Sequence, residues 1–190
     1  LELKAPHLKV VRHDHNRGYG AALKSGIRCA LGDIIVITDA DGTYPNDMIP
    51  KLVFDLETAD MVVGARTGNS VMYSSLRRIP KIFLRAYCEW ITEQTIPDMN
   101  SGLRAFRKSI ALKLLHVLPN SFSFTTTITI AMMTNNYIVR YVPINYAARI
   151  GKSKIKPIRD TLRFCQLIMR TGLYFSPVRA FSPVIALFAL

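Results

Sequence analysis

Short apolar blocks alternate with polar segments from residue 7 onward, and the spacing inside the blocks changes from one block to the next. β-Branched runs bounded by Gly, Pro or Asp predict buried strands, whereas apolar residues three and four apart predict helices. On this basis we expect strands at 7–12, 34–38 and 61–64 and helices at 20–30 and 45–58. Strands that alternate with helices are typical of an α/β protein with a mainly parallel, doubly wound sheet.

The middle of the chain continues this alternation, with one segment whose type the pattern leaves open. We expect one long helix or a helical pair at 74–95, a strand at 102–106, a helix at 109–118 and a strand at 137–146. Residues 122–135 have a helical periodicity, but several threonines in this segment compete with it, because β-branched residues favour strands. The segment is therefore either a helix or a strand.

The last part of the chain combines an amphipathic pattern with an apolar end. Residues 156–176 predict a helix with one apolar face and one cationic face. The apolar face is formed by Ile158, Leu162, Cys165, Met169 and Leu173. The cationic face is formed by Arg159, Arg163, Gln166 and Arg170. Such a helix commonly lies in a membrane interface, and a surface helix of the globular domain is the alternative. Residues 177–190 predict the beginning of a transmembrane helix, or else a short buried helix, because the apolar run is shorter than the ~20 residues of a full span.

The charge of the chain is concentrated in its second half. The 190 residues carry a net charge of +12. Residues 1–98 balance 12 basic against 12 acidic side chains, whereas residues 99–190 carry 13 basic side chains and one acidic side chain, Asp160. This asymmetry indicates an anionic partner, such as phosphorylated substrates, an anionic membrane face or nucleic acid. The three scattered cysteines form no disulfide framework and fit a reducing compartment.

The strand at 34–38 ends in Asp39-Ala40-Asp41-Gly42, which places two carboxylates where open α/β sheets bind ligands. Adjacent side chains of a strand point to opposite faces, so the carboxylates converge only if the backbone turns, and Gly42 and Pro45 supply a turn. Converging carboxylates together with phosphate oxygens hold Mg²⁺ or Mn²⁺ in many proteins. A solvated acidic turn without a metal is the alternative.

Several blocks stand in an order that resembles one enzyme family. They are Asn16-Arg17-Gly18-Tyr19-Gly20, Asp39-Ala40-Asp41, Val62-Val63-Gly64-Ala65-Arg66, Asp98-Met99-Asn100-Ser101-Gly102-Leu103-Arg104 and Arg149-Ile150-Gly151-Lys152-Ser153-Lys154. In this order they resemble family 2 glycosyltransferases of the GT-A fold, in the polyprenyl-phosphate (dolichyl-phosphate mannose or glucose synthase-like) branch. The resemblance implies a Rossmann-like sheet with flanking helices, of which 1–155 is a part that lacks the family's first strands.

The resemblance also implies roles for particular residues on the donor side. The diphosphate of the nucleotide sugar is expected to contact Gly18, Asp39, Asp41, Arg66, Arg149 and Lys154. Asp39 and Asp41 are expected to hold Mg²⁺ or Mn²⁺. Thr43 stands where this branch often has a glutamine ligand, so it is the expected third ligand, although a hydroxyl binds a metal more weakly. A structural ion pair is the alternative role of Arg66.

On the acceptor side the resemblance implies a catalytic carboxylate and a set of phosphate-binding groups. Asp98 is expected to face the acceptor as the catalytic base, and the acceptor phosphate is expected to contact Arg77, Arg78, Arg104 and Ser153. The chemistry leaves the role of Asp98 open, because a phosphate monoester is already anionic near pH 7 and needs no strong base. Asp98 could instead orient the acceptor or bind metal, and an Asx turn or helix cap is its structural alternative.

The resemblance implies an inverting, metal-dependent enzyme that moves one hexose from UDP- or GDP-hexose to a polyprenyl phosphate, at the cytoplasmic face of a membrane and without nucleic acid. The processive-synthase motif ending in Arg-Trp is absent, since Trp90 is the only tryptophan, and this favours transfer of a single sugar. Two alternatives remain. One is a glycosyltransferase whose acceptor is a hydroxyl group, for which Asp98 must act as a base. The other is a non-catalytic basic module that binds a membrane or nucleic acid.

Overall fold

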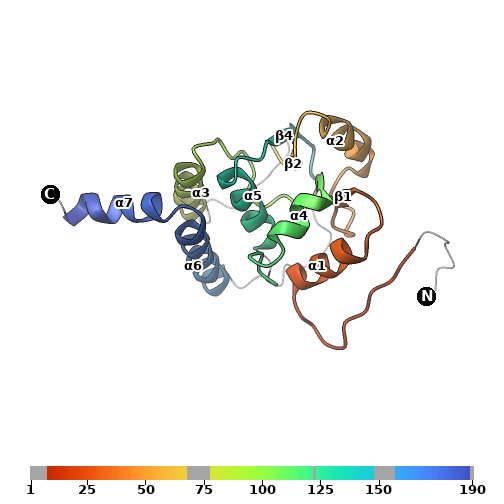
Figure 1. The fold of residues 1–190 in the computed structure, drawn as a ribbon, viewed down its shortest axis with the longest axis horizontal. Coiled ribbons are helices and arrows are strands. Elements are labelled where there is room, and N and C mark those ends of the chain that lie inside the picture. Colours follow the sequence, from red (N-terminus) through yellow and green to blue (C-terminus); the bar gives the residue numbers. More distant parts are fainter. Residues whose placement is uncertain (1–7, 68–77, 122, 148–156, 189–190) are drawn as a thin grey trace.

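The computed structural model describes residues 8–67, 78–121, 123–147 and 157–188 (Figure 1). The elements along the chain are α1 (Tyr19–Cys29), β1 (Ile34–Ile37), the 3₁₀ helix η1 (Asn46–Met48), α2 (Ile49–Asp55), β2 (Met61–Ala65), α3 (Arg78–Thr92), β3 (Arg104–Arg107), α4 (Lys108–Leu114), α5 (Phe124–Thr134), β4 (Val139–Pro143), α6 (Pro157–Phe175) and α7 (Pro177–Phe188). Most expected elements are confirmed within a few residues. The expected helix at 45–58 is divided into η1 and α2.

The four strands form a mixed sheet in the order β1-β3-β2-β4. Strand β3 runs antiparallel to both β1 and β2, and β2 and β4 are parallel. The expected mainly parallel sheet is therefore not what the strands form. The physical reason lies in where β3 begins: Arg104 pairs with Ile37 of β1 and with Val63 of β2, near the ends of these strands. A strand that begins beside the carboxyl ends of β1 and β2 can pair with them along its length only if it runs antiparallel to both.

The direction of β3 determines where the polar loops meet. The segments after β1 and β2 and the segment before β3 all lie at the same edge of the sheet, because Ile37 and Val63 both pair with Arg104. Asp39 and Asp41 follow β1, Arg66 follows β2, and residues 98–103 precede β3. The candidate residues of three separate sequence blocks thus come together at one edge.

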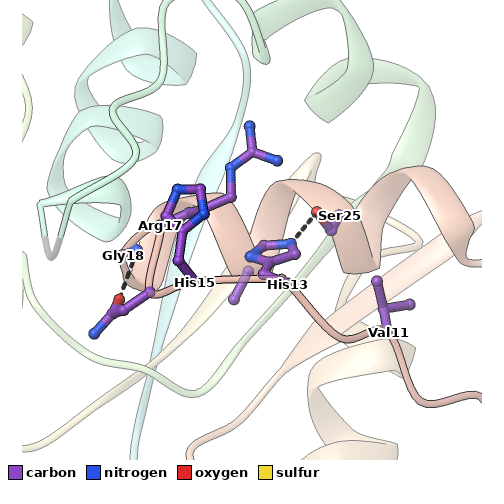
Figure 2. Close-up of a pocket in the computed structure, with 8 residues that line it drawn as sticks. Val11, His13, His15, Arg17, Gly18 and Ser25 are labelled. Carbon is purple, nitrogen blue, oxygen red and sulfur yellow. Dashed lines mark hydrogen bonds between the residues drawn. The ribbon is translucent and has the colours of Figure 1, made fainter.

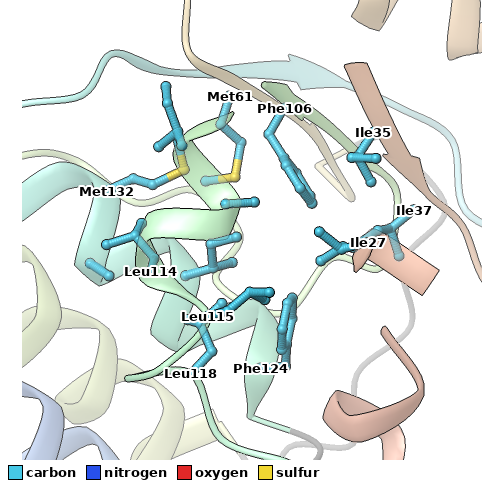
Figure 3. Close-up of a cluster of buried hydrophobic side chains, with 14 of the residues drawn as sticks. Ile27, Ile35, Ile37, Met61, Phe106, Leu114, Leu115, Leu118, Phe124 and Met132 are labelled. Carbon is cyan, nitrogen blue, oxygen red and sulfur yellow. The ribbon is translucent and has the colours of Figure 1, made fainter. Parts of the chain in front are cut away.

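Helices cover both faces of the sheet, and the alternation of side chains along each strand separates two cores. On one face, Phe106 packs with Ile35 and Ile37 of β1 and with residues of α1, α4 and α5 (Figure 3). On the other face, Val62 and Ala105 pack against Leu52 of α2. A third cluster joins α3, α5 and α6.

The segment that the sequence left open is the helix α5, and its central position explains its composition. Residues Phe124–Met133 are all buried, so this part of the helix has no face exposed to solvent. Thr129 and Thr134 donate hydrogen bonds from their hydroxyls to the carbonyls of Thr125 and Ile130, four residues earlier. Such back-bonding satisfies a hydroxyl inside a helix, so threonine is compatible with this buried position.

The expected strand at 7–12 is not formed in its described part. Residues 8–12 have no regular secondary structure and pair with no strand of the sheet. Their alternating apolar residues remain exposed, including Leu8 and Val10. A strand is stable only within a ladder, so an alternating pattern alone does not produce one.

Helices α3, α6 and α7 gather at one end of the molecule, and α7 projects from it (Figure 1). Helix α6 packs through Ile168 and Gly172, and Gly172 lies against Ile91 and Tyr87 of α3. Met169 and Leu173, which belong to the expected apolar stripe, are exposed. Within the described ranges no helix is long and apolar enough to cross a membrane.

Candidate active site

The first carboxylate at the sheet edge, Asp39, lies between a glycine and a tyrosine. The hydroxyl of Tyr19 in α1 lies 3.4 Å from Asp39 Oδ1. On the other side is Gly102, where an added Cβ would lie 2.7 Å from Asp39 Oδ2. Burial, reinforced by the charge of Asp39, raises the pKa of Tyr19 to about 12, so this hydroxyl keeps its proton and acts as a donor. The position of Asp39 thus depends on α1 and on the segment before β3.

The second carboxylate, Asp41, is oriented by the turn that follows it. Thr43 donates two hydrogen bonds to Asp41 Oδ1, one from its hydroxyl at 2.6 Å and one from its backbone N–H at 3.3 Å. Gly42 between them has φ of 72°, a conformation that glycine adopts readily. Thr43 itself is only 2% exposed. In this arrangement the hydroxyl expected to bind a metal instead directs its hydrogen to the carboxylate beside it.

Asp98 and Arg66 form a two-pronged ion pair, although they are 32 residues apart in the chain. Arg66 Nε lies 2.7 Å from Asp98 Oδ2, and Nη2 lies 2.9 Å from Oδ1. The backbone N–H groups of Arg66 and Asn100 also donate to this carboxylate, at 3.1 and 3.0 Å. The side chains of Asp98 and Arg66 are 9% and 18% exposed. Paired geometry of this kind is the strongest form of the carboxylate–guanidinium contact.

These contacts keep Asp98 ionised. Burial by itself would raise the pKa of the carboxyl, but the hydrogen bonds and charge of Arg66, with the N–H of Asn100, hold the pKa below its ordinary value. A carboxylate with a lowered pKa is a weak base. The structural ion pair that the sequence left open for Arg66 is therefore formed.

Two tyrosines that the sequence reasoning did not select complete this part of the site. The guanidinium of Arg66 lies 5.2 Å from the ring centroid of Tyr146, within the range of a cation–π contact. The ring of Tyr146 packs edge-on against Tyr44 at 5.1 Å. The Tyr44 hydroxyl accepts a hydrogen bond from the Gly102 N–H at 2.6 Å. The one sequence signal that could have selected Tyr44 for the site was its place directly after the Asp-Ala-Asp-Gly-Thr turn.

Arg104 lies in the interior, and this corrects the expectation that it binds the acceptor phosphate. The residue is 0% exposed. Its guanidinium donates to the carbonyls of Ser101 and Thr125 and to the hydroxyl of Thr129. A phosphate at the surface cannot reach a group that is enclosed in this way.

Gly18 is required by the backbone at the start of α1. Its φ is 95°, and a side chain there would overlap the carbonyl of Asn120. The Gly18 N–H bonds to Asn16 Oδ1, as drawn beside a shallow pocket of about 390 Å³ in Figure 2. His13 also lines this pocket and bonds to Ser25 at 2.9 Å. The expected diphosphate contact of Gly18 stays a prediction.

The remaining expected residues are not placed by the structure. Arg77, Arg149, Ser153 and Lys154 lie outside the described residues, and Arg78 is described only as the first residue of α3. Among the residues that are described, no group of three or more His, Cys, Asp or Glu side chains is arranged to hold a metal ion. The metal-binding role expected for Asp39, Asp41 and Thr43 stays a prediction.

Comparison with known sequences decides the family. The pattern of Glycosyl transferase family 2 matches residues 1–115, more than half of the chain. The chain belongs to this family. The resemblance noted in the sequence is thereby confirmed.

Two relatives within family 2 indicate its branch. The chain is 32% identical over 181 residues to the undecaprenyl-phosphate 4-deoxy-4-formamido-L-arabinose transferase of Pseudomonas fluorescens strain Pf0-1, a match covering 89% of the chain and 48% of the relative. It is 29% identical over 146 residues to the dolichyl-phosphate hexose transferase of Haloferax volcanii, covering 74% of the chain and 62% of the relative. The chain thus spans between about half and two thirds of the length of these curated relatives.

Solved structures confirm the α/β architecture of this glycosyltransferase family member. Glucosyl-3-phosphoglycerate synthase from Mycobacterium tuberculosis, in complex with Mn²⁺, UDP and phosphoglyceric acid, superimposes with a TM-score of 0.61. The match covers 92% of this chain and 56% of the synthase at 18% sequence identity. At this identity the likeness is one of fold, and it supports the GT-A-like fold expected from the sequence.

Proposed function

We propose that this protein transfers a single hexose from a nucleotide sugar, UDP- or GDP-linked, to a polyprenyl phosphate. The proposal is supported by the names of the relatives, which are transferases for undecaprenyl and dolichyl phosphate. The observation that carries it is the partly buried pair of Asp98 and Arg66, at the same sheet edge as Asp39 and Asp41. This arrangement suits an acceptor that is already anionic.

The argument rests on what each acceptor demands of the enzyme. A hydroxyl acceptor must lose its proton, and this requires a group with a pKa near neutral pH. Asp98 has a pKa below its ordinary value and accepts four hydrogen bonds. A phosphate acceptor, by contrast, is ionised near pH 7 and attacks without a base. The state of Asp98 therefore favours the phosphate acceptor over the hydroxyl alternative.

In the proposed reaction Asp98 positions the guanidinium of Arg66 and does not remove a proton from the acceptor. By holding the Arg66 fork, it fixes a guanidinium that also contacts the ring of Tyr146. A phosphate oxygen of the acceptor attacks the anomeric carbon of the sugar, and the bond from that carbon to the nucleotide diphosphate breaks. A single displacement of this kind inverts the anomeric configuration.

A divalent cation fits the donor side of the proposed site. Mg²⁺ is usually held by one or two carboxylates, with phosphate oxygens and water as the other ligands. Asp39 and Asp41, which directly follow β1, are the carboxylates that would supply this donor set. The solved neighbour of similar fold contains Mn²⁺ and UDP. When bound, Mg²⁺ or Mn²⁺ would neutralise charge on the leaving diphosphate.

We propose further that 1–155 is the catalytic part of the chain and that its C-terminal helices contact the cytoplasmic face of a membrane. In support, α6 and α7 expose large apolar side chains at the end of the molecule that they share with α3. These side chains are Met169, Leu173, Tyr174, Val178, Phe181, Ile185 and Phe188. The excess of basic residues in 99–190 supports cytoplasmic sidedness, because cytoplasmic flanks of membrane segments are rich in Lys and Arg.

The proposal is tested with the full-length protein in membranes. Labelled UDP- and GDP-hexoses are supplied with polyprenyl phosphate and Mn²⁺ or Mg²⁺, and the label that enters the organic phase is counted. Asp41→Asn should abolish the transfer, whereas Asp47→Asn, an exposed carboxylate of η1, should leave it unchanged. Label that appears without added metal contradicts the metal site. No transfer to polyprenyl phosphate, with transfer to a hydroxyl acceptor, refutes the proposed acceptor.

A further inference from the structure

Arg104 is a buried cation whose guanidinium donates to uncharged oxygens. The residue is 0% exposed, and among the described residues no ion pair includes it. Its donors are satisfied instead by backbone and hydroxyl oxygens on two separate elements. Placing a cation in the interior is unfavourable unless its hydrogen bonds are well made, so this arrangement calls for a specific explanation.

The two groups that Arg104 joins are the turn before β3 and the helix α5. Nε and Nη2 donate to the carbonyl of Ser101, while Nη1 donates to the carbonyl of Thr125 at 2.9 Å and to the hydroxyl of Thr129 at 3.1 Å. The planar guanidinium can bond in both directions at once because its donors form a rigid fork. Arg104 thus connects the turn to a fully buried helix.

A second contact joins the same turn to the same helix. The Thr126 hydroxyl in α5 donates to Asn100 Oδ1 at 2.6 Å. Asn100 in turn donates its backbone N–H to Asp98. The turn is also tied to the sheet, because the Ser101 hydroxyl bonds to the carbonyl of Gly64.

The turn carries groups of both halves of the site. Asp98 stands at its start and holds Arg66, and Gly102 near its end lies against the carboxylate of Asp39. A shift of this turn would therefore move the proposed donor carboxylate relative to the Asp98–Arg66 pair. Displacements of about 1 Å in a catalytic arrangement can cost on the order of a hundredfold in rate.

We infer that Arg104 and Thr126 are positioning residues, which hold the turn of residues 98–102 from the inside of the protein and so set the separation between the donor and acceptor parts of the site. We call the hold of Arg104 and Thr126 on this turn the clamp, and it rests on geometry alone. The effect of the clamp on catalysis rests on the proposed function. It assigns a purpose to the threonine-rich sequence of α5, whose hydroxyls face this turn at Thr126 and the guanidinium at Thr129.

The experiment compares two matched substitutions in one helix. Thr126→Val removes the hydroxyl that bonds to Asn100, whereas Thr127→Val removes a buried hydroxyl that has no hydrogen-bond partner among the described residues. Arg104→Lys adds a variant that keeps the charge but loses the fork. Hydrogen exchange of residues 98–104, thermal unfolding, and kcat and KM for nucleotide sugar and polyprenyl phosphate are measured on full-length protein, with rates expressed per folded molecule.

We expect faster exchange in residues 98–104 for Thr126→Val and Arg104→Lys but not for Thr127→Val. We expect kcat to fall about tenfold for Thr126→Val and about a hundredfold for Arg104→Lys, more than the loss of folded protein explains. Unchanged exchange in the turn overturns the clamp. Faster exchange with an unchanged kcat per folded molecule overturns the catalytic consequence. A wild-type protein that transfers no sugar refutes the proposed function, and the exchange comparison still decides the clamp.

Discussion

The contact between Gly102 and Asp39 makes a sharp prediction for the variant Gly102→Ala. An added Cβ would lie 2.7 Å from Asp39 Oδ2 and 3.1 Å from its Cγ. Ordinary van der Waals contacts begin at 3.4 Å, so the carboxylate must retreat by roughly 0.7 Å. The carboxylate is the far end of a side chain that can rotate, so the fold should accommodate the change, but the carboxylate would leave the place where it is proposed to hold the metal.

The expected loss follows from this displacement. A shift approaching 1 Å should reduce kcat/KM for the nucleotide sugar by between about tenfold and a hundredfold. The control is Gly26→Ala, because a Cβ on Gly26 in α1 meets nothing within 4 Å. Replacing a mid-helix glycine by alanine should stabilise the protein by about 0.5–1 kcal/mol and leave activity unchanged.

The assay measures Mn²⁺-dependent binding of nucleoside diphosphate and label transfer to polyprenyl phosphate, with full-length protein in membranes, and thermal unfolding gives the folded fraction. Gly102→Ala should remain folded and lose both metal-dependent binding and transfer. Wild-type binding and transfer in a folded Gly102→Ala protein would refute the reasoning, since the position of Asp39 would then not matter.

Three further predictions concern stability. The pKa of Asp98 is lowered from 3.8, so its ion pair should stabilise the protein above about pH 3.8 and lose this contribution as the pH falls through the lower, folded-state pKa. Asp98→Asn should lower the free energy of unfolding by about 2 kcal/mol at pH 7. In urea unfolding, this variant should also show a weaker dependence of stability on acid pH. Tyr141→Phe removes a buried hydroxyl for which the described part of the chain offers no hydrogen-bond partner, so the free energy of unfolding should stay equal or rise by up to about 1 kcal/mol. Gly172→Ala should destabilise by about 1–3 kcal/mol through overlap with Ile91, and an unchanged melting temperature would contradict the close packing of α6 on α3.

Local patterns predicted those elements whose signals are contained in short segments. The strands at 34–38 and 61–64, observed as β1 and β2, were expected because their β-branched runs are bounded by turn residues. Helix α1 was expected from its apolar spacing, and Gly18 precedes it with the positive φ that a side chain would oppose. The order of motifs also indicated the family, which the match over residues 1–115 confirms.

Other features depended on contacts between distant residues and left no local signal. Arg66 was expected to bind diphosphate, and its pairing with Asp98 became visible only when two loops met. Arg104 was expected at the acceptor, but the register of β3 between β1 and β2 places it in the interior. Periodicity could not show this, because charged side chains are seldom fully buried.

The sequence by itself determined the alternation of strands and helices, the carboxylates at the end of β1, and membership of the glycosyltransferase family. These properties depend on neighbouring residues, or on motifs that keep their order along the chain. Only the tertiary structure decided that β3 runs antiparallel, that Phe124–Met133 of α5 are all buried, that Gly102 lies against Asp39, and that Asp98 pairs with Arg66. The physical reason is that strand direction and burial are set by which surfaces close against each other, and such pairings are made between segments far apart in the chain.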